Sequence, residues 1–202
     1  MKITIEAINT FAVYACLMAV AGGAAAASDW NTSLLLEKGL RVDTLEKARN
    51  AYLAAGDRVG NTRIVAIIDY GMHSSKPRLF LFDTEHGTQE ALLVSHGRGS
   101  DPDHDGWADR FSNVEGSKMS SLGAYLTRNV YYGKHGMSLR LVGLDASNDS
   151  ALERAIVMHG ADYVAPGLAK MGRSWGCPAI QRRHVARLLP KLAGGAFLYI
   201  AR

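Results

Sequence analysis

The sequence has few cysteines, no run of basic residues and no zinc-peptidase motif. Two cysteines among 202 residues are too few for a disulfide-stapled secreted domain. The net charge is only +4, and no cluster of Lys and Arg suggests a nucleic-acid-binding protein. With 48% hydrophobic and 21% charged residues, the composition is typical of a folded globular domain rather than a disordered chain.

Metal-binding motifs are absent or incomplete. No His-Glu-x-x-His is present, and five histidines are scattered over turn-rich segments, which argues against a zinc peptidase. The segment Asp101–Asp109 matches the first part of an EF-hand-like calcium loop, but its twelfth position is Ser112 instead of a bidentate Glu. We interpret this segment as a solvated acidic turn, with calcium binding as the alternative, and we expect neither a metal nor a cofactor in the protein.

The first 27 residues have the pattern of a secretory signal peptide. A short apolar stretch from Phe11 to Val20 precedes small residues that end at Ala27. The apolar stretch is too short for a typical bilayer span, and Gly22-Gly23 interrupts it. We therefore expect cleavage near Ala27, export across the inner membrane and no stable membrane anchor. Cys16 would be removed, so that Cys177 would be the single thiol.

After the signal peptide, residues 28–60 are predicted to form a helical lead-in and residues 61–202 a mainly β domain. A helix is expected over Asp43–Ala55, with Asp43 as N-cap, Glu46 in the capping-box position and Gly56 at its end. Its apolar face is expected to consist of Leu45, Ala48, Tyr52 and Ala55. A shorter helix is expected over Leu34–Lys38.

Short apolar and alternating segments predict the strands of this domain. They cover residues 63–69, 78–83, 90–95, 138–143, 155–158 and 196–201. A last helix is expected over 184–190, stopped by Pro190. The polar segment between Gly97 and Ser121 is predicted to be a long loop, and long loops in compact domains are often functional.

Cys177 and His159 could act as a nucleophile and its base. Cysteine catalysis needs a thiolate, a base and donors for the developing oxyanion. His159 follows an apolar strand, and Gly176 would let backbone N–H groups approach a substrate carbonyl. Pro178 suits the first position of a helical turn, whose dipole would lower the pKa of the Cys177 thiol. On spacing alone, the alternative is an inert buried cysteine and a core histidine.

The sequence around these residues resembles the YkuD-type L,D-transpeptidases. The sequence contains His159-Gly160 and then Ser174-x-Gly176-Cys177, with fourteen residues between His159 and Ser174. Further segments are similar to the murein L,D-transpeptidase catalytic branch: Ser95–Ser100, Phe111–Asn113, Ser120–Tyr125, Tyr132–Gly136 and Arg154–Gly160. The resemblance extends from about residue 63 to the C-terminus. It implies the family's β-sandwich-type catalytic domain, mainly β with flanking helices.

The resemblance also implies roles for individual residues. Cys177 corresponds to the nucleophile and His159 to the general base, while the backbone of Gly160 orients the histidine. Ser174 and Gly176 correspond to the residues that bracket the oxyanion site.

The motif departs from the common family pattern at two places. Trp175, which we place at the substrate site, stands where the commoner motif has a second His. Pro178-Ala179 stands where a hydrophobic residue and an Arg or Asn are usual. Arg173 or Arg182 could supply the missing polar group.

The implied substrate is the stem peptide of peptidoglycan. Cys177 would attack the carbonyl of the third residue, release D-Ala and form a thioester. An amine acceptor would give a 3→3 cross-link, and water would give L,D-carboxypeptidase activity. A catalytically silent wall-binding protein on the same fold is the remaining alternative. The resemblance implies acylation by carbapenems, no nucleic-acid partner, and a location in the periplasm or at the cell wall.

Overall fold

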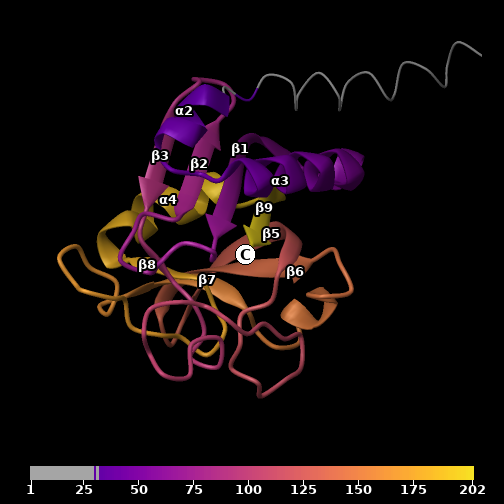
Figure 1. Cartoon of the computed structure of the whole chain (residues 1–202). Helices are drawn as coiled ribbons and strands as arrows, with labels where there is room; N and C mark the ends of the chain where they lie inside the picture. The colour runs from indigo at the N-terminus through magenta and orange to yellow at the C-terminus, as the bar shows by residue number, and fades with distance from the viewer. Residues whose placement is uncertain (1–29, 31) are drawn as a thin grey trace, which may run out of the picture.

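The computed structural model describes residue 30 and residues 32–202 (Figure 1). The predicted signal peptide, including Cys16, lies outside these described residues. None of the helices in the described part is both long and apolar enough to cross a membrane.

One nine-stranded sheet forms the body of the protein, in the order β3-β2-β1-β9-β5-β6-β7-β8-β4. The strands are β1 (Asn61–Asp69), β2 (Leu79–Asp83), β3 (Gln89–Leu92), β4 (Val94–Ser95), β5 (Gly123–Gly133), β6 (Gly136–Gly143), β7 (Val157–Ala161), β8 (Ala179–Gln181) and β9 (Ala196–Ala201). Pairing is antiparallel except between β1 and β9 and between β7 and β8. The helices are α2 (Thr32–Glu37), α3 (Val42–Ala55) and α4 (Arg182–Leu192), with short 3₁₀ turns at Gly56–Arg58 and Asp149–Ala151.

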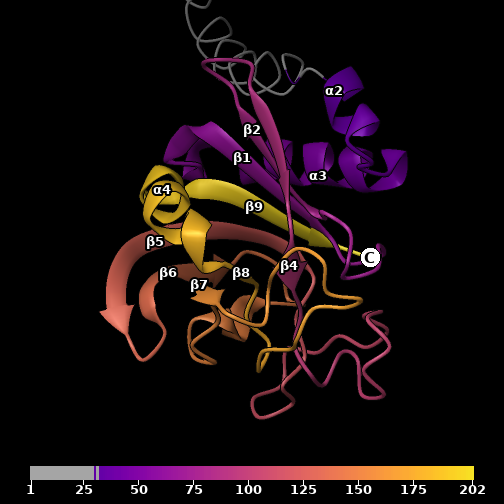
Figure 2. The ribbon, with the colours of Figure 1, turned by 90° about the vertical axis from the view of Figure 1, so that its left-hand side faces the viewer.

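The sheet curls, so that its two halves enclose a core. Figure 2 shows β5 and β6 curving away below β1 and β9, and the register of the β5–β6 pairing shifts between Thr127 and Val130. Such a bulge increases local twist and bends the strand. The main hydrophobic cluster joins one face of β1 to β6 and β7, and its members include Ala66, Leu139 and Met158. The predicted mainly β, sandwich-type fold with flanking helices is therefore confirmed.

The two faces of β1 bury different partners because side chains alternate along a strand. Ile64 and Ile68 face the main cluster, which α4 also covers. Val65 and Ile67 face the other side and pack with residues of α3, among them Tyr52. The face of α3 that the sequence indicated is buried as expected: Leu45, Ala48, Tyr52 and Ala55.

The start of α3 differs from the prediction. The helix begins at Val42, its N-cap residue is Arg41, and no side chain caps it, so the predicted Asp43 cap is wrong. The Arg41 guanidinium instead binds the buried carboxylate of Asp69 at 2.7 and 2.9 Å, and the Thr44 hydroxyl donates to the same carboxylate at 3.1 Å. This tertiary contact fixes the first turn of α3 against the end of β1. Gly56 ends the helix with φ +51°, as predicted.

Three other boundaries were predicted wrongly. Ala155 has φ +53°, which no strand allows, so β7 begins at Val157 and His159 lies in its middle instead of at its end. Pro190 lies inside α4 and does not end it. The helix continues to Leu192, because its residues Leu188, Leu189 and Leu192 are buried against the core. The predicted strand 90–95 is split into β3 and β4.

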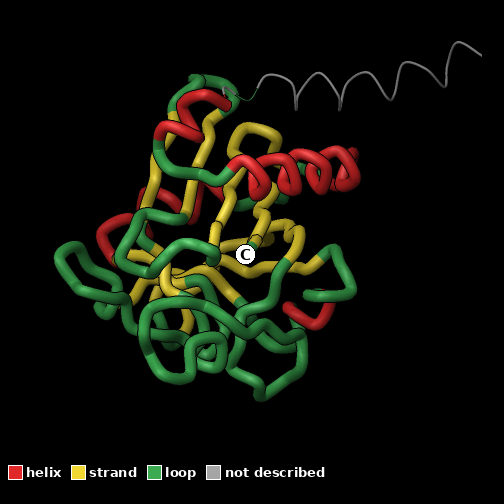
Figure 3. The backbone as a smooth tube through the Cα atoms, in the orientation of Figure 1, coloured by secondary structure: helices red, strands yellow, loops and turns green. Residues whose placement is uncertain are grey.

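Two strands were not predicted at all. β5 is the longest strand of the sheet, and its alternation is obscured by exposed residues after Thr127. β8 occupies the place where Pro178 suggested a helical turn. The long loop after Gly97 was predicted correctly; Figure 3 shows such loops gathered at one end of the molecule.

A buried chain of three polar side chains holds the start of this loop. The fully buried Arg78 donates to Nδ1 of His96 at 2.6 Å, and Nε2 of His96 is 3.0 Å from Oδ2 of Asp101. Because Nδ1 accepts from arginine, the ring proton lies on Nε2 and is donated to Asp101. Burial and the neighbouring Arg78 charge lower the pKa of His96 to about 4, so the ring is neutral.

The same chain corrects the interpretation of Asp101–Asp109 as a solvated turn. Asp101 is buried, and its carboxylate accepts the backbone N–H groups of Asp105 and Gly106 as well as His96. The carboxylates of Asp103 and Asp105 lie near it and are exposed. Asp101 therefore folds the loop through hydrogen bonds to its own backbone.

We predict that Arg78→Met destabilises the protein by roughly 3 kcal/mol or more, because the acceptors that its guanidinium binds, the carbonyls of Met72 and Val94 and Nδ1 of His96, would lose their donor inside the protein. Arg63→Met serves as the matched control: Arg63 also lies in the sheet region and pairs with Asp83 at 3.3 Å, but it is half exposed. Its loss should cost less than about 1 kcal/mol. Urea unfolding followed by circular dichroism measures both. Equal, small losses would contradict the role assigned to Arg78.

Candidate active site

The parallel pairing of β7 with β8 brings the two predicted catalytic residues together. His159 of β7 is in register with Ala179 of β8, and its N–H points to the carbonyl of Pro178 at 3.4 Å. Cys177 directly precedes Pro178. His159 and Cys177, eighteen positions apart in the sequence, therefore lie on neighbouring backbone segments.

A tight turn over Ser174–Cys177 presents the cysteine. The Ser174 hydroxyl donates to the carbonyl of Cys177 at 2.6 Å and accepts the N–H of Gly176 at 3.1 Å. Gly176 has φ +122°, and a Cβ there would come within 2.7 Å of the Met119 carbonyl. Only glycine fits this position, as the motif suggested. Ser174 therefore acts on the shape of the turn.

Ser120 locks this turn to the long loop. Its hydroxyl accepts the N–H of Gly97 at 3.0 Å and donates to the carbonyl of Gly176 at 3.1 Å. The N–H of Ser174 also binds the carbonyl of His96 at 2.9 Å. The turn is thereby joined to the buried Arg78–His96–Asp101 chain. Sequence reasoning gave Ser120 no role, although it begins one of the family-like segments.

The Cys177 thiol is partly buried, and its hydrogen-bond partners are backbone groups. The Val157 N–H lies 3.4 Å from Sγ, and Sγ lies 3.8 Å from the Ala155 carbonyl. Burial raises the pKa of the Cys177 thiol, while the Val157 N–H and the charge of Arg154 oppose that rise. The predicted helix N-terminus is wrong, because β8 follows Cys177. Without that dipole, the resting group is a thiol and not a thiolate.

His159 is a neutral imidazole with a fixed tautomer. Its Nδ1 donates to the carbonyl of Gly160 at 3.1 Å, which leaves the lone pair on Nε2. Burial lowers the pKa of His159 to about 4, the Gly160 carbonyl opposes this, and the charges of Lys134 and Arg182 add to it. An unprotonated Nε2 at neutral pH is what a general base requires.

Gly160 matters through its lack of a side chain as well as through its carbonyl. A Cβ there would come within 2.6 Å of Val185 and 3.3 Å of the Arg182 backbone. The glycine thus allows α4 to pack directly on β7, next to His159.

His135, which the sequence gave no specific role, stacks on His159. The two ring centroids are 4.2 Å apart and the ring planes differ by 18°. His135 belongs to the tight turn between β5 and β6. A hollow of about 320 Å³ lies beside the stack and is lined by Tyr132, His135, Gly160, Arg182 and Val185, among others. The stack limits rotation of the His159 ring.

The backbone donors around the cysteine are not all free. The Gly176 N–H is already bound to Ser174. In the described part of the chain, no acceptor is hydrogen-bonded to the Cys177 N–H. Of the two backbone N–H groups predicted to form the oxyanion site, those of Gly176 and Cys177, the Cys177 N–H is therefore the one left to donate to an oxyanion.

The two arginines suggested as substrate ligands have other partners. The Arg173 guanidinium donates to the Asp101 carbonyl, which ties the motif to the acidic loop. Arg182 pairs with Asp162 at 2.5 Å. Trp175, in contrast, extends into solvent and is 65% exposed.

Two groups of side chains in the described residues could approach a metal ion. They are Asp83, Glu85 and His86, and Asp101, Asp103 and Asp105. Neither group contains Cys177 or His159.

Two of the solved structures to which the chain is similar are L,D-transpeptidases. One from Mycobacterium tuberculosis H37Rv is 13% identical with a TM-score of 0.47, over 69% of this chain and 58% of that chain. L,D-transpeptidase 3 of M. tuberculosis is 12% identical with a TM-score of 0.47, over 69% of this chain and 61% of that chain. The chain thus matches less than two thirds of the length of either protein. No curated protein gives a significant sequence match.

The family itself is shown by the sequence. Residues 36–201 match the family model described as the L,D-transpeptidase catalytic domain, and this span includes His159, Cys177 and every strand of the sheet. The chain therefore belongs to the L,D-transpeptidase catalytic domain family.

Proposed function

We propose that this protein is a peptidoglycan L,D-transpeptidase that acts on stem tetrapeptides through a thioester on Cys177. One observation carries the proposal: within the matched family domain, a neutral imidazole fixed by the Gly160 carbonyl lies on the strand that pairs with the segment carrying the thiol. The proposed location is the periplasm or the cell wall, where this substrate is found.

The first half-reaction forms the acyl-enzyme. Nε2 of His159 takes the thiol proton while Sγ attacks the carbonyl carbon of the third residue. The Cys177 N–H donates to the oxyanion that develops. When the tetrahedral intermediate collapses, the bond to D-Ala breaks, and the His159 imidazolium protonates the departing amine. The product is a thioester on Sγ.

Substrate binding must bring Sγ closer to His159. At rest, the hydrogen bonds of Sγ go to Val157 and Ala155, and none in the described residues reaches His159. Catalytic hydrogen bonds are often long before substrate binds and tighten in the complex. The stacked, tautomer-fixed ring of His159 is already oriented for this approach.

The second half-reaction decides between two activities. An amine from a neighbouring stem loses a proton to the neutral His159 and attacks the thioester carbonyl. The C–Sγ bond then breaks, the His159 imidazolium returns the proton to Sγ, and the product is a 3→3 cross-link. Water in the same position gives an L,D-carboxypeptidase. Both use the same thioester, so the acceptor alone separates them.

We predict that the protein gains the mass of one meropenem molecule and that Cys177→Ala gains none. The thiol opens the β-lactam ring, the amide C–N bond breaks and the ring nitrogen takes the proton, so the whole drug is retained. Intact-mass spectrometry measures the adduct. Wild-type protein that gains no adduct and leaves a tetrapeptide muropeptide unchanged would support a silent wall-binding protein instead.

The products formed from the muropeptide identify the acceptor that reacts with the thioester. A cross-linked dimer indicates transfer and a free tripeptide indicates hydrolysis.

We predict an acid limb in the rate of meropenem acylation centred near pH 4, because the pKa of His159 is lowered to about 4. Protonation of Nε2 removes the base, so the rate falls as pH falls through this value and is flat across neutral pH. Stopped-flow fluorescence gives the profile, and circular dichroism at each pH controls for unfolding. An acid limb near the ordinary histidine pKa of about 6.5 would contradict the assigned environment of His159.

A further inference from the structure

Three cations from three separate segments surround the exposed ring of Trp175. The distances to the ring centroid are 5.6 Å from the guanidinium carbon of Arg98, 5.0 Å from Nζ of Lys118 and 5.7 Å from Nζ of Lys134. An indole face attracts cations through its quadrupole. Three like charges around one ring nevertheless repel each other. We call these four residues the Trp175 cluster.

The positive charge of the Trp175 cluster is not neutralised within the protein. In the part of the chain that the structure describes, none of the three cations forms an ion pair with a carboxylate. Some exposed arginines elsewhere do have such partners: Arg187 pairs with Glu90 and Arg202 with Asp109, each at 2.7 Å. The Trp175 cluster is distinguished by the meeting of three such unpaired cations at one ring.

The backbone that carries the cations is fixed by the active site itself. The Arg98 N–H donates to the carbonyl of Ser174 at 2.8 Å, and the Gly99 N–H donates to the carbonyl of Lys118 at 2.9 Å. Lys118 has φ +56°, a left-handed conformation that is strained for a non-glycine residue. The protein thus maintains local strain at the residue that brings the second cation to the ring.

The third cation is coupled to the reacting groups. Lys134 directly precedes His135, whose ring stacks on His159. The charge of Lys134 contributes to the lowering of the His159 pKa and opposes the rise of the Cys177 pKa, so it acts on both. Trp175 itself is two residues from Cys177. The Trp175 cluster therefore borders the place where the substrate carbonyl must lie.

We propose that the Trp175 cluster is a subsite for a carboxylate of the acyl donor, next to the carbonyl that Cys177 attacks. This inference rests on the proposed function and identifies the surface that recognises the acyl donor. When the third residue is diaminopimelate, the tetrapeptide has a carboxylate on each side of that carbonyl: one on the side chain of the diaminopimelate and one at the terminal D-Ala. The cluster supplies a polar group in place of the Arg or Asn of the common motif, where this chain has Pro178-Ala179, while Arg173 and Arg182 are held by other partners.

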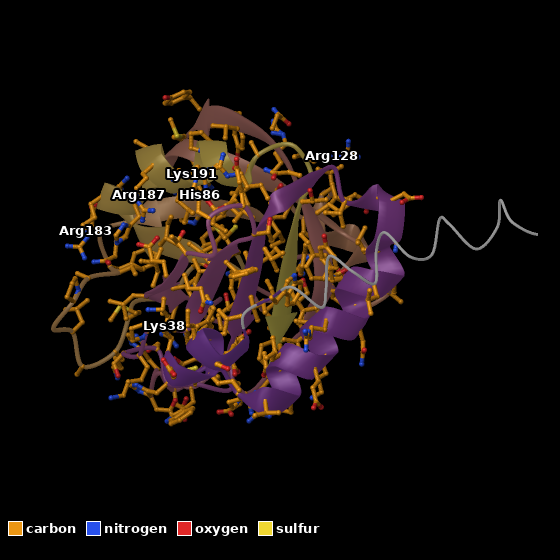
Figure 4. The ribbon with its side chains drawn as sticks, turned by 90° about the horizontal axis from the view of Figure 1, so that it is seen from above. Lys38, His86, Arg128, Arg183, Arg187 and Lys191 are labelled. Carbon is orange, nitrogen blue, oxygen red and sulfur yellow. The ribbon has the colours of Figure 1, made fainter. Side chains whose placement is uncertain are left out.

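The role of the three cations in substrate binding is tested by replacing each with an uncharged glutamine. Arg98→Gln, Lys118→Gln and Lys134→Gln should each lower kcat/KM for a synthetic stem tetrapeptide about threefold, as expected for exposed charge pairs, and the triple variant at least about tenfold, mainly through KM. Lys191→Gln removes the same charge from α4, where Figure 4 shows it among other basic side chains, and should change nothing. Alkylation by neutral iodoacetamide, measured in parallel, reports whether the thiol itself is altered.

Amidated donors identify the carboxylate. One tetrapeptide is amidated at the terminal D-Ala and another at the third residue's side chain. The donor that lacks the bound carboxylate should react equally with the wild type and the triple variant. The inference is overturned if the triple variant keeps full kcat/KM on the acidic donor, or if it loses as much on a donor with both groups amidated.

Binding separates this inference from the proposed function. Calorimetry with Cys177→Ala, which cannot turn over, should show weaker tetrapeptide binding when the three cations are also neutralised. A wild type that acylates no donor but shows this loss of binding would contradict the proposed reaction and support the subsite. A wild type that turns over the tetrapeptide, together with binding that stays unchanged when the three cations are neutralised, would support the proposed reaction and contradict the subsite.

Discussion

The parallel pairing of β7 with β8 is the constraint on which the site depends. It places the backbone of His159 against Pro178 and so sets the cysteine beside the histidine. The pairing in turn needs glycine at 160, where α4 packs on the strand, and at 176, where the turn passes the Met119 carbonyl. The long loop closes over the turn through the Ser120 hydroxyl, and the buried Arg78–His96–Asp101 chain holds that loop. A stabilising network thus extends from the core to the nucleophile.

Burial, and not a helix dipole, sets the electrostatics of the pair. It raises the pKa of the Cys177 thiol and lowers that of His159, so both groups are neutral at rest. Such a pair avoids the cost of two buried charges until the substrate arrives. Of the three cations at Trp175, Lys134 lowers the pKa of both groups: its charge disfavours an imidazolium at His159 and favours a thiolate at Cys177. Positioning and charge are therefore supplied by different segments of the site.

The sequence predicted the parts of the fold that local patterns encode. The buried face of α3 and its end at Gly56 were recovered because helical spacing and a left-handed glycine are local signals. The start of α3 depends on Asp69, far along the chain, and was missed. At the site, the residue types singled out Cys177 and His159, and the family resemblance implied their roles and that of the Gly160 backbone, which the geometry accommodates. The stack with His135 and the cluster at Trp175 join distant loops and have no local signature.

The central claim is that a neutral thiol and a neutral imidazole with its proton on Nδ1 form the resting site. Nitrogen-15 NMR of histidine-labelled protein, with His159→Gln to assign the signals, tests it directly. The account predicts that at pH 7 the His159 ring shows a protonated Nδ1 and an unprotonated Nε2, and that it titrates near pH 4. A ring protonated on both nitrogens at pH 7, or one with its proton on Nε2, would contradict the account.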